Sequence, residues 1–381
     1  MTTPPLSLYI HLPWCMRKCP YCDFNSHPLP PVYDYAAYVD ALLADLRFEL
    51  GSIQGRTLET IFIGGGTPSL FPANQVKRVL DAVSDLVPCA KGVEVTLEAN
   101  PGTLEGGRYA GYREAGINRL SIGVQSFNDR ALQRLGRIHG ADMALRAFFL
   151  AREAGFENIN LDLMFGLPMQ TVDEAGLDLE TAITLAPEHI SYYQLTIEPN
   201  TRFAVAPPPL PEEGRLWNIQ TRGQKMLARA GYHRYEVSAY ASSRRRCRHN
   251  LNYWEFGDYL GIGAGAHSKV SDTPGQRVRR CSRIASPAAF TAAAGTRDAL
   301  SSDYHLSETD LIIEFMMNLL RLSTGFTEDL FQNRTGLPYA RVKPMLSEAL
   351  RRGLLHSDGT QYRPTALGHR YLNDLLVLFL D

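Results

Sequence analysis

The sequence predicts an α/β fold built around a parallel barrel, and two observations support this prediction. Six short runs rich in aliphatic and β-branched residues recur up to residue 195, and a longer amphipathic stretch follows most of them. Alternating strands and helices are typical of parallel sheets with helical crossovers. The pattern then changes after residue 206, where a proline-rich segment begins. We therefore expect a partial (β/α)6 barrel, similar to a TIM barrel, followed by a mixed helical, winged-helix-like C-terminal domain.

The predicted strands are, in order, 6–12, 60–63, 93–98, 119–124, 158–164 and 189–195. Apolar residues at helical spacing predict intervening helices at 38–50, 76–86, 103–115 and 142–154. The last two are followed by Gly116 and Gly155, and glycine commonly ends a helix. In barrels of this kind, chemistry occurs at the carboxyl ends of the strands, so candidate residues should follow each strand.

The segments after residue 206 suggest two further units. Three prolines at 207–209 precede a predicted helix at 212–230, a β-like stretch at 232–240, a basic turn at 242–249 and a glycine-rich strand at 259–267. Helices at 311–322 and 339–351, short strands at 353–356 and 362–364, and a last helix at 366–380 follow. The predicted division is 1–206 for the barrel, 207–300 for an extension and 301–381 for the C-terminal domain.

Composition narrows the functional class. The chain has 381 residues, 45% of them hydrophobic, and a formal net charge of −1, which is ordinary for a globular protein. This balance gives no reason to expect nucleic acid as a partner. No export signal or membrane-spanning run is evident, so we expect a cytoplasmic protein, with a peripheral position at the membrane as an open alternative.

Three of the six cysteines, Cys15, Cys19 and Cys22, lie within eight residues directly after the first predicted strand. In the cytosol, such spacing favours metal binding over disulfides. Three thiolates can hold a [4Fe–4S] cluster and leave one iron open for chemistry. The alternatives are a zinc knuckle completed by His11 or His27, or unrelated core cysteines.

Polar residues also follow the later strands. Glu98, Gln125 and Asp162 lie at or near strand ends, and Arg137 lies in the following connection. A buried carboxylate is costly unless it is paired or liganded. Together these residues favour a polar ligand with ribose hydroxyls, and the alternative is a structural Asp–Arg pair inside the barrel.

The order of strand, CxxxCxxC loop, helix, strand and Gly64-Gly65-Gly66-Thr67-Pro68 resembles the radical S-adenosylmethionine (SAM) superfamily. The resemblance implies that SAM chelates the open iron. One electron from the cluster then cleaves a carbon–sulfur bond to give a 5′-deoxyadenosyl radical. From residue 6 to 380 the chain is similar to the coproporphyrinogen-dehydrogenase-like (HemN-like) family. That similarity implies SAM contacts by Tyr9, Tyr21, Gly65, Gly66, Thr67, Glu98, Gln125, Arg137, Asp162 and Thr196.

Two functions are open within this family. One is oxygen-independent coproporphyrinogen III dehydrogenase, which decarboxylates two propionates oxidatively, and the other is a heme chaperone. Three features favour the chaperone. Phe24 stands where the dehydrogenases carry an additional cysteine, only eight residues precede Tyr9 where they have a longer extension, and residues 249–254 match the HNxxYW motif of the chaperone branch. Dehydrogenase activity is therefore not expected.

The HNxxYW motif also predicts a heme site. His249 could ligate heme iron, and Tyr253 and Trp254 offer flat apolar faces for a porphyrin. His267 and Cys247 are alternative ligands, and the arginines at 244–246 and 248 could pair with propionates. The alternative is a structural role, in which a solvated basic loop precedes core aromatic residues and His249 is hydrogen-bonded in place. The implied partners are heme and recipient hemoproteins, with membrane-bound respiratory enzymes among the candidates, and a homodimer is left open.

One position departs from the family pattern. Phe165 stands where relatives carry His or Tyr, so any hydrogen-bonding role of that side chain does not transfer. Phe165 can only stack or pack. Cys89 and Cys281 have no partner at a meaningful spacing, and we interpret both as incidental thiols.

Overall fold

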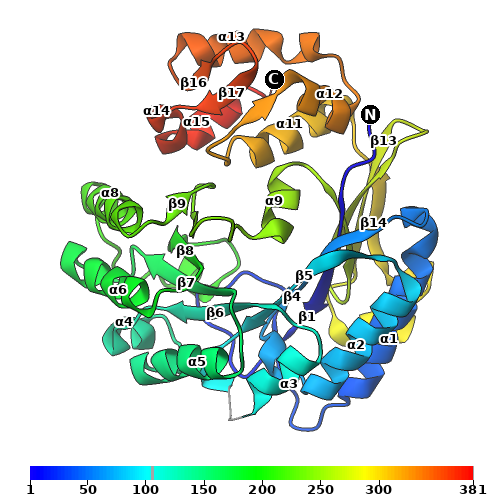
Figure 1. The fold of residues 1–381 in the computed structure, drawn as a ribbon, viewed down its shortest axis with the longest axis vertical. Coiled ribbons are helices and arrows are strands. Elements are labelled where there is room, and N and C mark those ends of the chain that lie inside the picture. The colour runs from blue at the N-terminus through cyan, green and yellow to red at the C-terminus, as the bar shows by residue number, and fades with distance from the viewer. Residues whose placement is uncertain (104–106, 381) are drawn as a thin grey trace.

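A twelve-stranded sheet forms the centre of the computed structural model, which describes residues 1–103 and 107–380 (Figure 1). Six parallel strands are neighbours in chain order, as predicted. They are β1 (Leu6–Leu12), β4 (Leu58–Gly65), β5 (Cys89–Ala99), β6 (Arg119–Gln125), β7 (Ile159–Phe165) and β8 (His189–Gln194). The predicted partial barrel is therefore confirmed, with strand ends that differ from the prediction by a few residues.

Helices cover the outer face of these strands (Figure 1). They are α1 (Tyr35–Ile53), α2 (Ala73–Leu86), α3 (Arg108–Glu114), α4 (Asp129–Arg134), α5 (Ala141–Glu153) and α6 (Val172–Leu185), with short 3-10 turns at Pro68–Leu70 and Pro101–Thr103. The predicted helix at 103–115 begins later than expected, and its residues 104–106 lie outside the described residues. None of the described helices is long and apolar enough to cross a lipid bilayer.

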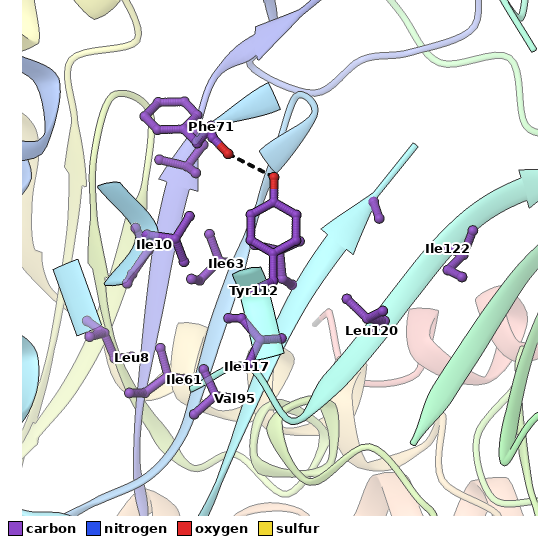
Figure 2. Packing of buried hydrophobic residues seen from close by; sticks show 14 of the residues in the cluster. Leu8, Ile10, Ile61, Ile63, Phe71, Val95, Tyr112, Ile117, Leu120 and Ile122 are labelled. Carbon is purple, nitrogen blue, oxygen red and sulfur yellow. Dashed lines mark hydrogen bonds between the residues drawn. The ribbon is translucent and has the colours of Figure 1, made fainter. Parts of the chain in front are cut away.

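Alternation along the strands explains the core. Leu8 and Ile10 of β1 point to the same face as Ile61 and Ile63 of β4, and all four are buried under the helices (Figure 2). Tyr112 of α3 joins this layer, and its hydroxyl donates a hydrogen bond of 2.8 Å to the carbonyl of Phe71. The intervening side chains point into the barrel and are mostly polar, which leaves the interior available for a ligand.

The extension lengthens the sheet at both edges. One edge receives β11 (Asp258–Ile262), which is parallel to β1, and then the antiparallel strands β12 (His267–Asp272), β13 (Arg277–Arg283) and β14 (Leu300–His305). The other edge receives β10 (Ala239–Ala241) and β9 (His233–Arg234). Helix α7 (Arg202–Val205) precedes the extension. The helices of the extension are α8 (Glu213–Arg229), α9 (Arg248–Trp254) and α10 (Pro287–Ala293), with a 3-10 turn at Arg297–Ala299.

The prediction of one strand over 259–267 was wrong. Gly263 and Gly265 have φ of 104° and 76°, in the left-handed region that favours glycine, so the chain turns between β11 and β12. A Cβ at Gly265 would lie 2.3 Å from the side-chain nitrogen of Asn25. The turn therefore packs directly against the loop that carries the cysteines.

The C-terminal part has a core of its own, centred on Phe315, Phe326 and Phe331. Its helices are α11 (Glu308–Leu319), α12 (Glu328–Thr335), α13 (Lys343–Arg351), α14 (Ala366–Arg370) and α15 (Leu372–Val377), with a 3-10 turn at Tyr339–Arg341. A three-stranded sheet, β15 (Phe326–Thr327), β17 (Gln361–Pro364) and β16 (Leu355–Ser357), completes it.

Two details of the C-terminal prediction were wrong. The single helix expected at 366–380 is broken at Tyr371 into α14 and α15, and the prediction missed α12 and β15. The domain boundaries at 206 and 300 stay a prediction. The larger apolar core contains residues from Leu6 to Ala299, so the barrel and its extension share one core.

Candidate functional site

The cysteine loop begins at the carboxyl end of β1. Cys15 ends the short strand β2 (Trp14–Cys15), which pairs with β3 (His27–Pro28), and the Cys22 amide donates to the Cys19 carbonyl in a tight turn. All three thiols are half-buried on this loop. Sequence spacing therefore translates into three thiols carried by one loop at the barrel mouth.

Each of the three thiols has its own polar neighbour. The Thr67 hydroxyl lies 3.4 Å from the sulfur of Cys15, and the Arg137 guanidinium lies 3.7 Å from the sulfur of Cys19. Ser26 lies 3.9 Å from the sulfur of Cys22. Donors of this kind stabilise thiolates and tune the potential of a bound iron–sulfur cluster.

The glycine loop is packed against the cysteine segment. The amide of Gly66 donates to the Leu12 carbonyl at 2.8 Å, and the amide of Thr67 donates to the Trp14 carbonyl at 2.7 Å. A Cβ at Gly66 would lie 2.6 Å from that Trp14 oxygen, so a side chain does not fit here. The GGGTP segment therefore sets the position of the cysteine loop.

The geometry of this loop fits an iron–sulfur cluster better than a zinc knuckle. Both ring nitrogens of His11 are in use, since Nδ1 pairs with the Tyr9 hydroxyl at 3.0 Å and Nε2 with the Asn25 carbonyl at 2.8 Å. His27 is bound to the Asn25 side chain at 3.0 Å. A cubane cluster, by contrast, needs only thiolate ligands from this loop.

A buried hydrogen-bond donor without a partner, next to the cysteine loop, also supports a bound cluster. The Arg137 guanidinium donates to the Gly123 carbonyl at 2.9 Å and approaches the Tyr21 hydroxyl at 3.5 Å, but its Nε is buried without a partner. A buried unpartnered donor beside three thiols is what a negatively charged ligand would satisfy.

Two carboxylates lie deeper in the barrel. Glu98 of β5 accepts the Gly65 amide at 3.2 Å, and burial together with nearby Asp162 raises the Glu98 pKa to about 8. Burial also raises the pKa of Asp162, which accepts from Ser121 at 2.9 Å and Asn160 at 2.8 Å. A hydroxyl and an amide therefore hold Asp162. The predicted alternative, an Asp–Arg pair, is present only as a longer-range charge interaction with the buried Arg119, because none of the described arginines lies within ion-pair distance of Asp162.

The other predicted SAM contacts are divided between the barrel interior and its rim. Gln125 ends β6 with φ of 68° and accepts the Tyr193 hydroxyl at 2.7 Å. Tyr9 lies inside the barrel on β1, whereas Thr196 follows β8 and is exposed. The barrel thus brings most of the predicted residues together and leaves Thr196 at its margin.

Helix α9 carries the HNxxYW motif between the barrel and the C-terminal domain (Figure 1). His249 is fully buried, with Nδ1 bound to the Thr60 hydroxyl at 2.8 Å and Nε2 bound to the Tyr253 hydroxyl at 3.0 Å. Burial, with the charge of Arg119, lowers its pKa to about 3. His249 is therefore a neutral residue with both ring nitrogens hydrogen-bonded, which agrees with the structural role given above as the alternative to heme ligation.

A cavity of about 540 Å³ connects the two sets of predicted residues. Its walls include Tyr9, Gly65 and Glu98 from the predicted SAM site, and Tyr253, Trp254 and His267 from the predicted heme site. Drug-sized and cofactor-sized ligands occupy cavities of roughly 300–1,000 Å³. The cavity can therefore hold a cofactor-sized, mostly apolar ligand beside the barrel mouth.

The predicted arginine run does not face this cavity. Arg248 pairs with Glu59 at 3.1 Å, and Arg246 stacks over the Tyr235 ring at 5.5 Å. The cations on the cavity wall are Lys269 and Arg280 instead. Phe24 also lines the cavity and is 59% exposed, so the position of the dehydrogenase cysteine carries an apolar ring here.

Two further predicted residues are buried elsewhere. Phe165 packs on the Tyr192 ring with centroids 4.6 Å apart, in keeping with a packing role. Cys247 is fully buried, and burial raises the pKa of its thiol to about 12. Its sulfur lies 3.7 Å from the carboxylate of Glu94.

Sequence reasoning missed Glu94, Lys269 and Arg280. Alternation along β5 could have indicated Glu94, because it faces the same way as Glu98 four residues later. The other two are on β12 and β13, where the prediction of the strands was itself incomplete.

Comparison with known proteins places this geometry in a family. Residues 9–182 match the radical SAM superfamily, and residues 306–371 match the HemN C-terminal domain. The heme chaperone HemW of Escherichia coli is 48% identical over 99% of this chain and 98% of its own, and that of Bacillus subtilis is 34% identical over 98% and 99%.

Among solved structures, coproporphyrinogen III oxidase (HemN) from Escherichia coli aligns with a TM-score of 0.83, covering 99% of this chain and 90% of its own at 22% identity. That likeness shows the fold alone. Membership in the radical SAM superfamily implies a [4Fe–4S] cluster and SAM. The chain belongs to the HemW family of heme chaperones within the radical SAM superfamily.

Proposed function

We propose that this protein is a heme chaperone that binds heme and passes it to recipient hemoproteins, and that it carries a [4Fe–4S] cluster and SAM. The observation that carries the proposal is the cavity of about 540 Å³ between α9 and the barrel mouth. Tyr253 and Trp254 contribute aromatic rings to its wall, and the cysteine loop contributes Phe24 and Asn25. The cavity therefore supports a porphyrin bound beside the cluster.

In this proposal Cys15, Cys19 and Cys22 hold the cluster, and Arg137 donates to its sulfur ligand. When bound, the cluster and SAM supply one-electron reductive chemistry. Glu98 and Gly65 form the part of the SAM site that opens onto the cavity wall. SAM and heme would then be neighbours, so the occupancy of one site can affect the other.

The alternative function is oxygen-independent coproporphyrinogen III dehydrogenase. The chain shares its fold with coproporphyrinogen III oxidase, so this activity is tested beside the chaperone function. Phe24 argues against it, because this exposed ring lines the cavity where the dehydrogenases would place a thiol. We expect no decarboxylation.

Recipients and location are part of the proposal. The recipients are hemoproteins, with membrane-bound respiratory enzymes as one candidate class, and the chaperone acts from the cytoplasm, including at the membrane surface. A homodimer is the assembly to test. No described helix spans a membrane, so contact with a membrane-bound recipient would be peripheral.

The test is an anaerobic titration of the reconstituted full-length chain with heme, followed by absorption, and a separate incubation with coproporphyrinogen III, SAM and reductant. We expect stoichiometric heme binding and no loss of propionate carboxyls. Product formation in the second assay, with no heme binding in the first, would replace the chaperone with the dehydrogenase.

The cluster has its own test. Cys15→Ala, Cys19→Ala and Cys22→Ala should each lose the reconstituted iron and its absorption, while Cys89→Ala, a half-buried cysteine on another strand, keeps both. Full iron content in any of the three loop variants would refute the ligand set.

A further inference from the structure

We propose that His267 is the protein ligand of heme iron in the cavity beside α9. The inference rests on the proposed function and goes beyond it by naming the residue that ligates the heme iron. Two histidines, His11 and His267, line this cavity, and a histidine ring nitrogen is a common axial ligand of heme. The question is which imidazole has a nitrogen free to face the porphyrin.

His11 does not have one. Its Nδ1 is engaged by the Tyr9 hydroxyl and its Nε2 by the Asn25 carbonyl, and the side chain is only 5% exposed. Ligation would break one of these bonds and leave a buried polar group unsatisfied, which is unfavourable. Its place between two fixed partners makes it a structural residue of the wall.

The residues of the motif region are less accessible still. His249 is fully buried with both ring nitrogens bonded, to Thr60 and Tyr253, and it lies behind the cavity wall. Cys247 is also fully buried, and its sulfur lies 3.7 Å from the Glu94 carboxylate inside the barrel. Neither reaches the cavity in which Tyr253 and Trp254 present their rings.

His267 meets the requirements. It is exposed on the cavity wall, and the described residues make no hydrogen bond to either of its ring nitrogens. It begins β12, opposite Ser282 of β13, so its backbone is held by the sheet. The preceding turn is fixed as well, because the Asn25 side chain donates to the Ala264 carbonyl at 2.9 Å. An unbonded imidazole on a rigid strand end is suited to ligation.

Aromatic and cationic neighbours complete the match to heme. Tyr253 and Trp254 line the cavity and offer apolar contact to a porphyrin, and Arg280, which also lines the cavity, offers a cation to a propionate. An ion pair with Glu314 of the C-terminal domain holds Arg280 at the cavity wall. The aromatic residues of the motif would thus contact the macrocycle, while His267 on β12 ligates the iron.

The experiment compares the cluster-reconstituted full chain with His267→Ala, His267→Cys and His249→Ala. Each is titrated with ferric heme and, separately, with metal-free protoporphyrin IX. His305→Ala removes an exposed histidine from β14, two strands away from β12 in the same sheet, and is the matched control. Circular dichroism and iron content check that each variant folds and keeps its cluster.

We expect His267→Ala to lose the histidine-ligated heme spectrum and to bind heme at least tenfold more weakly, with protoporphyrin affinity within about twofold of the parent. Added imidazole should restore the spectrum, and His267→Cys should give a thiolate-type spectrum. His305→Ala should match the parent in both titrations.

Two results would overturn the inference and leave the proposed function intact. They are a parent-like heme spectrum and affinity in His267→Ala, or loss of the ligated spectrum in His249→Ala alone. Failure of the parent chain to bind either heme or protoporphyrin would instead refute the proposed function, and the ligand assignment with it.

Discussion

The carboxylate of Glu94 accepts the backbone N–H groups of Arg248 and His249 at 3.2 and 3.0 Å, and so attaches the first turn of α9 to the interior of the barrel. Glu94 lies on β5, more than 150 residues earlier in the chain. Because a carboxylate suits the positive end of a helix, this contact fixes where the HNxxYW helix starts. It also determines which side chains of that helix reach the cavity.

We therefore predict that Glu94→Gln destabilises the fold by about 1–3 kcal/mol, since a buried charged acceptor of two amides is lost. Urea unfolding of the full chain measures this. Glu59→Gln is the matched control, because Glu59 pairs with Arg248 in a half-exposed ion pair whose loss should cost less than about 1 kcal/mol. Equal unfolding midpoints for the two variants would contradict the role assigned to Glu94.

Arg137 offers a second prediction, which concerns the cluster. Its guanidinium lies 3.7 Å from the Cys19 sulfur, and its buried Nε has no partner. A nearby positive charge favours the more negative, reduced form of a cluster. Arg137→Met should therefore lower the reduction potential by tens of millivolts while preserving iron content.

A redox titration monitored by electron paramagnetic resonance measures this shift. Arg134→Met serves as control, because Arg134 donates to the Pro168 carbonyl instead of a cysteine. An unchanged or raised potential in Arg137→Met would show that the guanidinium does not act on the cluster.

Glu98 leads to a prediction about pH. Its pKa is raised to about 8 in the fold, so the folded chain holds this proton over a range in which the unfolded chain has lost it. The stabilising effect is complete below about pH 4.5 and is lost as pH rises toward 8. For the chain without SAM, the free energy of unfolding should fall by on the order of a few kcal/mol across this window.

Glu98→Gln resembles the protonated form and should lack that decline. Other buried groups titrate in both proteins, so the difference between the two stability profiles isolates Glu98. Urea unfolding at half-unit pH steps measures both profiles. Profiles that run parallel from pH 5 to 8 would show that Glu98 is already ionised in the fold.

Local patterns were enough to predict the barrel. Alternation, helical periodicity and glycine stops locate the six parallel strands, and the spacing of Cys15, Cys19 and Cys22 places three thiols on one loop. The surroundings of His249 could not be predicted in this way. Its partner Thr60 lies 189 residues away, so only the folded chain shows that its nitrogens are in use.

The cavity shows the same limit. Its wall combines the cysteine loop, α9, β12, β13 and, through Asn318, the C-terminal helix α11. No local window of sequence contains these segments together. Proximity in sequence to the motif therefore points to the arginine run as the partner of propionates, whereas Arg280 reaches the cavity from β13, a strand that local patterns do not predict.

Glu314 provides the last prediction. Its carboxylate binds the Arg280 guanidinium at 2.5 Å, each side chain being about one-fifth exposed, and this ion pair joins β13 to α11. Asn318, one turn later on α11, lines the cavity, so movement of α11 would open the wall. Loss of the pair should favour the open form by roughly 1 kcal/mol, and heme should therefore leave Glu314→Gln about fivefold faster. Stopped-flow transfer of heme to excess apomyoglobin measures this rate.

The matched control is Glu308→Gln, also on α11, which alters an exposed ion pair with Arg341. This variant should release heme at the parent rate. If Glu314→Gln also releases heme at the parent rate, α11 does not control the exit, and heme leaves the cavity past the cysteine loop instead.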